Sequence, residues 1–457
     1  TTEIYTLSLH DALPICCTSH QRKGKWSVCM TEPAEAARGF WKTVFTKPVM
    51  SWALYDLANT IFSMNIVSLY LALWVLDMGG TDATWGYANS LAMLLVFVSA
   101  PILGALSDQA GRRLPFLKLC TVACVICTAA LGVGGLWVTL GFFVVANYFF
   151  QASLIFYDAT LSVVSTPKTK GVVGGFGVGI GYLGSFIGVV TGLVLLDRIG
   201  HVGIFRVTAL LFAFFAIPIF IYVKETGVHT KVRLTLKTAG KALRQVKDTL
   251  RHLPRYRGLG RFLLGRVFYT DAANTVIIFL GIYTQEEAGF DTTGTQLLML
   301  AAIVSAVLGG LILGSVVDRI GPKRTLNFVL GLWTVALVGA VAIPVFGLPV
   351  ATFWAVACVA GVALGGTWTA DRPYMLILAP PGRLGEFYGL YSMVGRFAAI
   401  IGPAMFALVS HTLGWGRPAA MGSLLVWILI AWVILRKVTD EERDWGPEDL
   451  LPPEVAG

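Results

Sequence analysis

The sequence predicts an all-α membrane protein whose twelve transmembrane helices form two pseudo-symmetric six-helix halves. Of its 457 residues, 56% are apolar and only 13% are charged, and the mean hydropathy is +0.73. A soluble protein carries about 25% charged residues. Apolar runs of roughly 20 residues, the length that crosses a bilayer, recur from Trp52 onward. A short charged motif also occurs twice, 210 residues apart, which indicates a duplicated chain.

The expected spans are separated by short breaks. They lie near residues 50–76, 85–106, 115–138, 141–166, 172–196, 204–223, 260–284, 295–317, 325–344, 349–378, 386–410 and 417–436. The even-numbered breaks carry most of the cations, and the breaks after the first and seventh spans carry only acidic charges. Because Lys and Arg are retained on the cytoplasmic side, we expect both termini to be cytoplasmic.

The sequence divides into two halves and three segments outside them. The predicted organisation is a tail (1–29), an N-terminal half (30–223), a basic cytoplasmic linker (224–258), a C-terminal half (259–438) and a cytoplasmic tail (439–457). The first tail resembles read-through translation of a sequencing adapter, so we expect it to be non-native and poorly ordered. The linker pattern is typical of an amphipathic helix on anionic headgroups. A plain connector held inside by its charge explains it equally well.

The duplicated motif lies between the second and third spans and again between the eighth and ninth. Gly104, Asp108 and Gly111 recur as Gly314, Asp318 and Gly321, and each copy ends in two cations. A tight glycine turn brings a carboxylate and cations together at a membrane surface, where such pairs can form in one conformation and break in another. The candidate gating residues are Asp108, Arg112, Arg113, Asp318, Lys323 and Arg324.

Ionisable residues inside the spans are the best indication of a central site, because each costs about 2.5–3.5 kcal/mol at bilayer depth even on insertion scales. The first and seventh spans present the same set of Tyr, Asp and Asn. The members are Tyr55, Asp56 and Asn59 in the first span and Tyr269, Asp271 and Asn274 in the seventh. These faces predict a site between the halves.

Other polar residues at depth extend this set. The fourth span contributes Gln151 and Asp158, the tenth Asp371 and Arg372, and the eleventh Arg396. The alternative is a group of buried ion pairs that fix helix register, for example Asp271 with Arg396. Arg266 is expected to snorkel to the cytoplasmic surface.

Glycines in the fifth span allow two interpretations. Gly177, Gly181, Gly184, Gly188 and Gly192 lie nearly on one stripe. Such a stripe lets membrane helices approach closely, either in static packing or where a helix slides between the halves.

No enzyme signature is present in the sequence. None of the six His residues lies within an apolar span, and phosphate-loop and zinc motifs are absent. We therefore expect no enzymatic activity, no cofactor and no metal. The basic residues lie in short loops, as topology signals do, and do not indicate nucleic-acid binding. The expected partners are lipid, a small solute and a coupling ion, and we expect a monomer.

The two loop motifs resemble the signature of the major facilitator superfamily, with Gln109 where that family usually has a cation. The helix motifs are more narrowly similar to its vacuole-effluxer, autophagy-related branch. They include the stretch from Trp52 to Asn59, the stretch from Tyr269 to Thr275, and the stretch from Glu386 to Ser392. The fourth span departs from that branch at Asp158 and Ser162, and in the tenth span Asp371 stands where a small polar residue is usual.

The resemblance implies a secondary transporter that works by alternating access, and the branch is associated with amino-acid efflux from fungal vacuoles. For this chain we expect a bacterial inner (plasma) membrane protein. Arg372 and Arg396 suit a substrate carboxylate, which favours an amino acid or a small organic acid. Proton coupling is expected, with Asp271 favoured by its depth. The alternatives are a glycoside–cation symporter and a non-transporting receptor or scaffold on the same fold.

Overall fold

The computed structural model describes residues 39–457 with several gaps. The gaps are residues 81, 226–243, 245–246, 248, 250, 252–255, 257, 442–444, 446–448 and 450–457. The predicted adapter-derived tail, most of the linker and much of the C-terminal tail therefore lie outside the described residues.

The N-terminal half contains six membrane-spanning segments preceded by a short helix. Its elements are α1 (Phe40–Val44), α2 (Lys47–Phe62), the π-helix η1 (Ser63–Leu69), α3 (Tyr70–Asp77), α4 (Asp82–Gln109), α5 (Leu114–Ala129), α6 (Gly135–Ala159), α7 (Leu161–Val164) and α8 (Lys170–Tyr222). The first span runs without a break from α2 through η1 to α3. Helix α8 contains two spans, because the backbone of Gly200 leaves the helical region at φ 65° and ψ 178°.

The C-terminal half repeats this organisation. Its elements are α10 (Leu259–Glu286), α11 (Thr292–Ile320), α12 (Pro322–Phe346), α13 (Thr352–Leu378), the 3-10 helix η3 (Pro381–Arg383), α14 (Leu384–Ala407), the π-helix η4 (Leu408–Thr412) and α15 (Gly416–Leu435). In the described chain, eleven helical segments are long and apolar enough to cross a membrane, and Leu114–Ala129 is a shorter apolar helix. The predicted twelve-helix architecture is confirmed.

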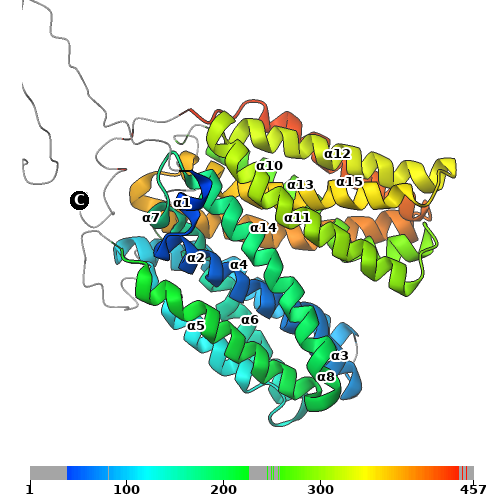
Figure 1. The fold of residues 1–457 in the computed structure, drawn as a ribbon, viewed down its shortest axis with the longest axis horizontal. Helices are drawn as coiled ribbons and strands as arrows, with labels where there is room; N and C mark the ends of the chain where they lie inside the picture. Colours follow the sequence, from blue (N-terminus) through cyan, green and yellow to red (C-terminus); the bar gives the residue numbers. More distant parts are fainter. Residues whose placement is uncertain are drawn as a thin grey trace, which may run out of the picture. The chain divides into compact units, whose positions relative to one another are not determined.

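Each half has its own apolar core. One cluster is built from residues between Val44 and Val223, and the other mainly from residues between Tyr256 and Val438. Figure 1 shows the two groups of helices, blue to green and yellow-green to red. They meet chiefly through α4 with α14 and α8 with α11. Helical segments satisfy their own backbone hydrogen bonds, as a bilayer requires.

The glycines of α8 serve two different contacts. The predicted stripe packs against the first span of the same half: a Cβ on Gly177 would overlap Trp52, and one on Gly184 would overlap the Leu57 carbonyl. A different face of α8 meets the other half, where Gly175 lies against the Gly310 carbonyl. The packing interpretation of the stripe is thus confirmed. The alternative interpretation, in which the stripe lies between the halves, is not supported, because the glycines that approach α11 (Gly171, Gly175 and Gly179) are two residues out of phase with it.

Candidate functional site

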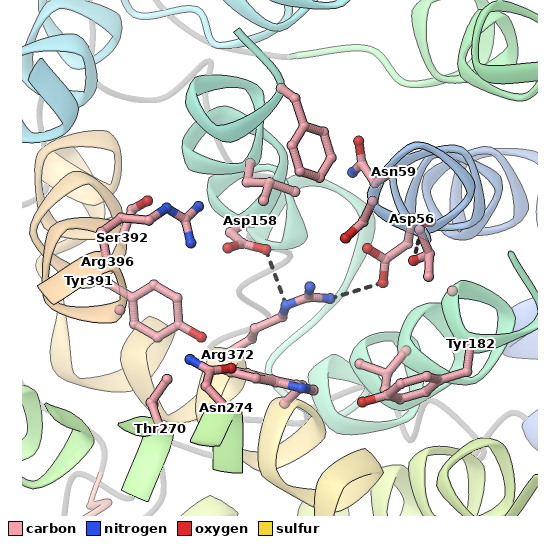
Figure 2. Close-up of a pocket in the computed structure, with 18 of the residues that line it drawn as sticks. Asp56, Asn59, Asp158, Tyr182, Thr270, Asn274, Arg372, Tyr391, Ser392 and Arg396 are labelled. Carbon is pink, nitrogen blue, oxygen red and sulfur yellow. Dashed lines mark hydrogen bonds and ion pairs between the residues drawn. The ribbon is translucent and has the colours of Figure 1, made fainter. Parts of the chain in front are cut away.

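A cavity of about 310 Å³ lies between the two halves. Its walls come from α2, α6 and α8 of the N-terminal half and from α10, α13 and α14 of the C-terminal half. Six of the candidate site residues line it: Asp56, Asn59, Asp158, Asn274, Arg372 and Arg396. Figure 2 shows most of these side chains directed into one space.

At the centre of the cavity one guanidinium joins the halves. Arg372 of α13 donates from Nη1 to Asp56 Oδ2 of α2 at 3.2 Å. Its Nε lies 3.1 Å from Asp158 Oδ1 of α6. This second contact is an ion pair without hydrogen-bond geometry, since Asp158 Oδ1 has no hydrogen-bond partner. Two carboxylates of the N-terminal half therefore share one cation of the other half, as the dashed lines in Figure 2 show.

The neighbouring Asp371 faces a separate network inside the C-terminal half. Its Oδ2 accepts from Arg266 Nε at 2.9 Å and from the Tyr391 hydroxyl at 2.8 Å, and its Oδ1 accepts from the Tyr269 hydroxyl at 2.5 Å. Arg266 also donates from Nη1 to the Tyr391 carbonyl at 3.0 Å and stacks on its ring. Arg266 is only 3% exposed, so the prediction that it snorkels to the surface was wrong. The ion pair with Asp371 compensates the burial of its charge.

Asp271 lies outside the cavity lining. It is buried, and its Oδ1 accepts from the Gly402 amide of α14 at 2.7 Å. The suggested pair of Asp271 with Arg396 is not formed. Among the described residues Arg396 has no ion-pair partner, and its buried Nε has no hydrogen-bond partner. Figure 2 shows its guanidinium directed into the cavity, toward the side that carries Asp158.

Tyr55 and Gln151 are also buried, but they do not line the cavity. The Tyr55 hydroxyl shares a hydrogen bond of 2.6 Å with Thr121 of α5. Gln151 is 7% exposed and does not line the cavity. The two repeats agree at these positions, because Asn59 and Asn274 both line the cavity, and neither Tyr55 nor Tyr269 does.

Several polar groups in the cavity wall have no partner within the described chain. Both amide atoms of Asn59, the Ser392 hydroxyl and Arg396 Nε are buried without a hydrogen bond. A buried polar group without a partner is costly. Other lining residues are apolar or aromatic, namely Phe150, Leu154, Val178, Tyr182 and Trp368. The cavity thus offers a free cation, free donors and acceptors, and an apolar surface to a small molecule.

The duplicated motifs join the halves at one end of the bundle, here called the motif end and defined by Asp108 and Asp318. Asp108 accepts from the amides of Gly385 and Glu386 at 2.8 and 2.7 Å, at the start of α14. Asp318 accepts from the amides of Gly171 and Val172 at 2.6 and 2.7 Å, at the start of α8. A carboxylate at a helix N-terminus is favoured by the free N–H groups and the helix dipole.

The motif cations have different surroundings. Arg113 Nη2 bonds to Asp108 at 3.3 Å, whereas Lys323 Nζ donates to the Arg436 carbonyl at 3.2 Å and not to Asp318. Arg112 and Arg324 are exposed. The turn glycines have positive φ in both copies, 61° at Gly111 and 89° at Gly321, a conformation that glycine adopts without strain.

Two further carboxylates at the motif end were not singled out in the sequence as site residues. Glu225 accepts from the amides of Arg113 and Leu114 at the start of α5, at 2.8 to 3.0 Å. Asp440 accepts from the Lys323 amide at the start of α12 at 3.2 Å. They lie 215 residues apart, which is also the separation of Asp56 and Asp271. Extending the repeat offset beyond the helices would have found them.

Comparisons with known proteins agree with this architecture. The model of the Major Facilitator Superfamily matches residues 57–403 and 262–450. The chain is 27% identical to the uncharacterized MFS-type transporter YxiO of Bacillus subtilis, over 87% of this chain and 96% of that protein. It is 24% identical to autophagy-related protein 22 of Pichia angusta, over 38% of this chain and 31% of that protein.

Solved structures show the same fold. The transporter FucP in its outward conformation aligns with a TM-score of 0.67 at 14% identity, covering 87% of this chain and 100% of FucP. A bacterial homologue of the iron transporter ferroportin, in an outward-facing state, aligns with a TM-score of 0.66 at 16% identity, covering 86% and 98% of the two chains. The chain belongs to the major facilitator superfamily and is a multi-pass membrane transporter, not an enzyme.

Proposed function

We propose that this protein is a secondary transporter that carries a small polar solute by alternating access, with an amino acid or a small organic acid as the favoured substrate. The observation that carries the proposal is Arg396. It is a guanidinium in the wall of the cavity between the halves, without an ion-pair partner in the described chain. An unpaired charge at bilayer depth marks a functional site.

Arg396 suits a carboxylate because its planar fork of donors matches two carboxylate oxygens. The sequence offered Arg372 and Arg396 for this role. Since Arg372 is shared by Asp56 and Asp158, we assign the substrate carboxylate to Arg396. The unsatisfied amide of Asn59 is available for an ammonium or hydroxyl group on the other end of the solute. An α-amino acid or a hydroxy acid has both features.

The two motif carboxylates would control access from one side. Because Asp108 and Asp318 each join one half to the other, we propose that they keep the motif end closed in this conformation. Their release would open that end to the cytoplasm, in the orientation predicted by the distribution of cations. We further propose that the protein acts as a monomer in a bacterial inner membrane.

Protons are the proposed coupling ion, and the structure changes which carboxylates are candidates. Asp56 and Asp158 line the cavity, whereas Asp271 bonds to Gly402 and does not. We therefore assign coupling to the cavity-lining pair.

The test is a thermal-shift screen of purified protein, because a ligand raises stability only where it binds. Amino acids and small carboxylic acids are expected to stabilise the wild type and not Arg396→Gln, with Arg396→Lys intermediate. Each hit is then measured for flux in proteoliposomes. Stabilisation by glycosides alone would favour a glycoside–cation symporter. Ligand binding without flux would favour a receptor or scaffold.

A further inference from the structure

We infer that the short helix α1 is a lipid-binding element, whose Trp41 and Phe45 side chains insert into the headgroup boundary of the leaflet at the motif end. The partner is a phospholipid surface. This face of the molecule takes no part in the proposed transport of a solute, so the inference holds whatever the substrate is.

Helix α1 has one docked face and one exposed face. On the docked face Val44 is fully buried, and the Phe40 ring packs edge-on against Phe176 of α8, with the ring centroids 6.5 Å apart. On the exposed face the rings of Trp41 and Phe45 stack at 5.4 Å with an interplanar angle of 15°, and the two residues are 65% and 63% exposed. Residues four apart share one side of a helix. The docked pair therefore fixes the direction in which the exposed pair points.

The docked face also places α1 at the motif end of the bundle. Phe176 lies near the start of α8, whose first amides, at Gly171 and Val172, bind Asp318. Figure 1 shows α1 beside α7 and the start of α2. The first membrane span begins at Lys47, three residues after α1 ends. Helix α1 thus lies where the chain enters the bilayer.

Phe176 belongs to the side of α8 that faces away from the cavity. Val178 and Gly181 of the same helix line the cavity. At 3.6 residues per turn, Phe176 lies on roughly the opposite side, together with Leu183 and Val190, which are exposed. Exposed apolar side chains on the outside of a helix bundle contact lipid tails in a bilayer. Helix α1 therefore covers the end of a lipid-facing stripe, and its own exposed rings continue that surface.

The side chains of the exposed face suit a lipid boundary. Aromatic rings concentrate where a membrane meets water, and interfacial helices bury their apolar side about 5–10 Å into the boundary between headgroups and acyl chains. Lys42 on the same helix and Lys47 at the start of α2 are exposed, and they bring cations to this boundary. Anionic headgroups attract such cations. The charges and the continuity with the lipid-facing stripe favour a lipid surface over a protein partner.

The lipid contact of α1 lies close to a contact between the halves. Gly175, which precedes Phe176, lies against the Gly310 carbonyl of α11. Helix α1 does not line the cavity. It therefore connects the leaflet with a helix that meets the other half, at a distance from the solute site.

The experiment locates the Trp41 ring relative to lipid and to water in nanodiscs. The full chain is labelled with fluorotryptophan, and the fluorine resonance that is missing from Trp41→Phe identifies Trp41. A lipid with a nitroxide at the top of its acyl chain is expected to broaden this resonance beyond detection. A water-soluble gadolinium chelate is expected to leave it visible. Trp333, assigned with Trp333→Phe, is the control, because it is 1% exposed near the middle of α12 and should keep most of its intensity with either probe.

Two results would overturn the inference. Loss of the Trp41 resonance with the chelate and not with the nitroxide lipid would place the rings in water. Retention with both probes would show that protein covers them. If neither Trp41→Phe nor Trp41→Tyr can be purified, photo-crosslinking tests the wild type directly. A lipid with a diazirine near its glycerol backbone is expected to label α1, and labelling of the spanning helices without α1 would refute the lipid contact.

Discussion

The two halves use repeat-related carboxylates in opposite ways. Asp371 in the C-terminal half receives three hydrogen bonds from its own half. Its counterpart in the N-terminal half is Asp158, which lies 213 residues earlier, close to the offset of the repeat. Asp158 lines the cavity and pairs with a cation from the other half. The same division separates Asp271, which bonds to Gly402, from Asp56, which pairs with Arg372.

This difference shows how a duplicated chain acquires distinct roles. The C-terminal half compensates its acids internally and therefore presents Arg372 and Arg396 to the cavity. In the N-terminal half, Asp56 and Asp158 line the cavity and are paired only with Arg372 of the other half. The acids that face the cavity thus belong to the N-terminal half, whereas the C-terminal half contributes the cavity cations Arg372 and Arg396 and keeps Asp371 paired within itself.

The largest expected effect comes from Asp371→Asn. Removal of this charge leaves Arg266 buried without an anion, a change that costs about 3–5 kcal/mol. Asp158→Asn is expected to cost much less, because Asp56 remains on Arg372. Thermal and denaturant unfolding of the two variants in lipid nanodiscs measures both losses of stability. Equal losses in the two variants would show that the halves do not differ in this way.

Much of this architecture could be predicted from the sequence. The apolar runs and the repeated motif predicted the twelve helices, and the first and seventh spans pointed to the cavity. The direction of individual side chains could not be predicted. Asp56 and Asp271 each lie three residues before an Asn that lines the cavity, but a residue on a helix faces different partners when packing rotates that helix by a small angle. The burial of Arg266 depends on Asp371, a contact between residues 105 positions apart.

At the motif end, Asp108 and Asp318 each bond from one half to the other, whereas Asp440 bonds within the C-terminal half. Loss of a charged hydrogen bond costs roughly 1.5–3 kcal/mol, so Asp108→Asn and Asp318→Asn should each accelerate local amide exchange by at least about tenfold. Both cross-half amide pairs, at Gly385 and Glu386 and at Gly171 and Val172, are expected to respond in either variant. Asp440→Asn is the control, because Asp440 bonds within the C-terminal half. Acceleration limited to the mutated pair would argue against a common opening.

Removing the hydroxyl of Tyr269 is expected to destabilise the protein more than removing that of Tyr55, its counterpart in the N-terminal half. Tyr269→Phe removes a hydrogen bond to a charged acceptor, at a cost of about 1.5–3 kcal/mol, whereas Tyr55→Phe removes a neutral one, at about 1 kcal/mol. Both side chains are fully buried, so lost solvation does not separate them. Urea or thermal unfolding of the single variants measures the difference. An equal cost would indicate that Asp371 is not held as an anion.

The smallest effect is expected for Asp271→Asn, the residue that depth alone favoured for coupling. The amide oxygen of Asn can still accept from Gly402, so the change in stability should be below about 1 kcal/mol. Once a transported solute is known, proton-driven accumulation in proteoliposomes should survive this substitution. Asp158→Asn, which removes a cavity-lining carboxylate, should retain solute exchange and lose accumulation. If Asp271→Asn abolishes accumulation while Asp158→Asn preserves it, the coupling residue lies in the C-terminal half. In that case a carboxylate of this protein does not need to line the cavity in order to couple transport to protons.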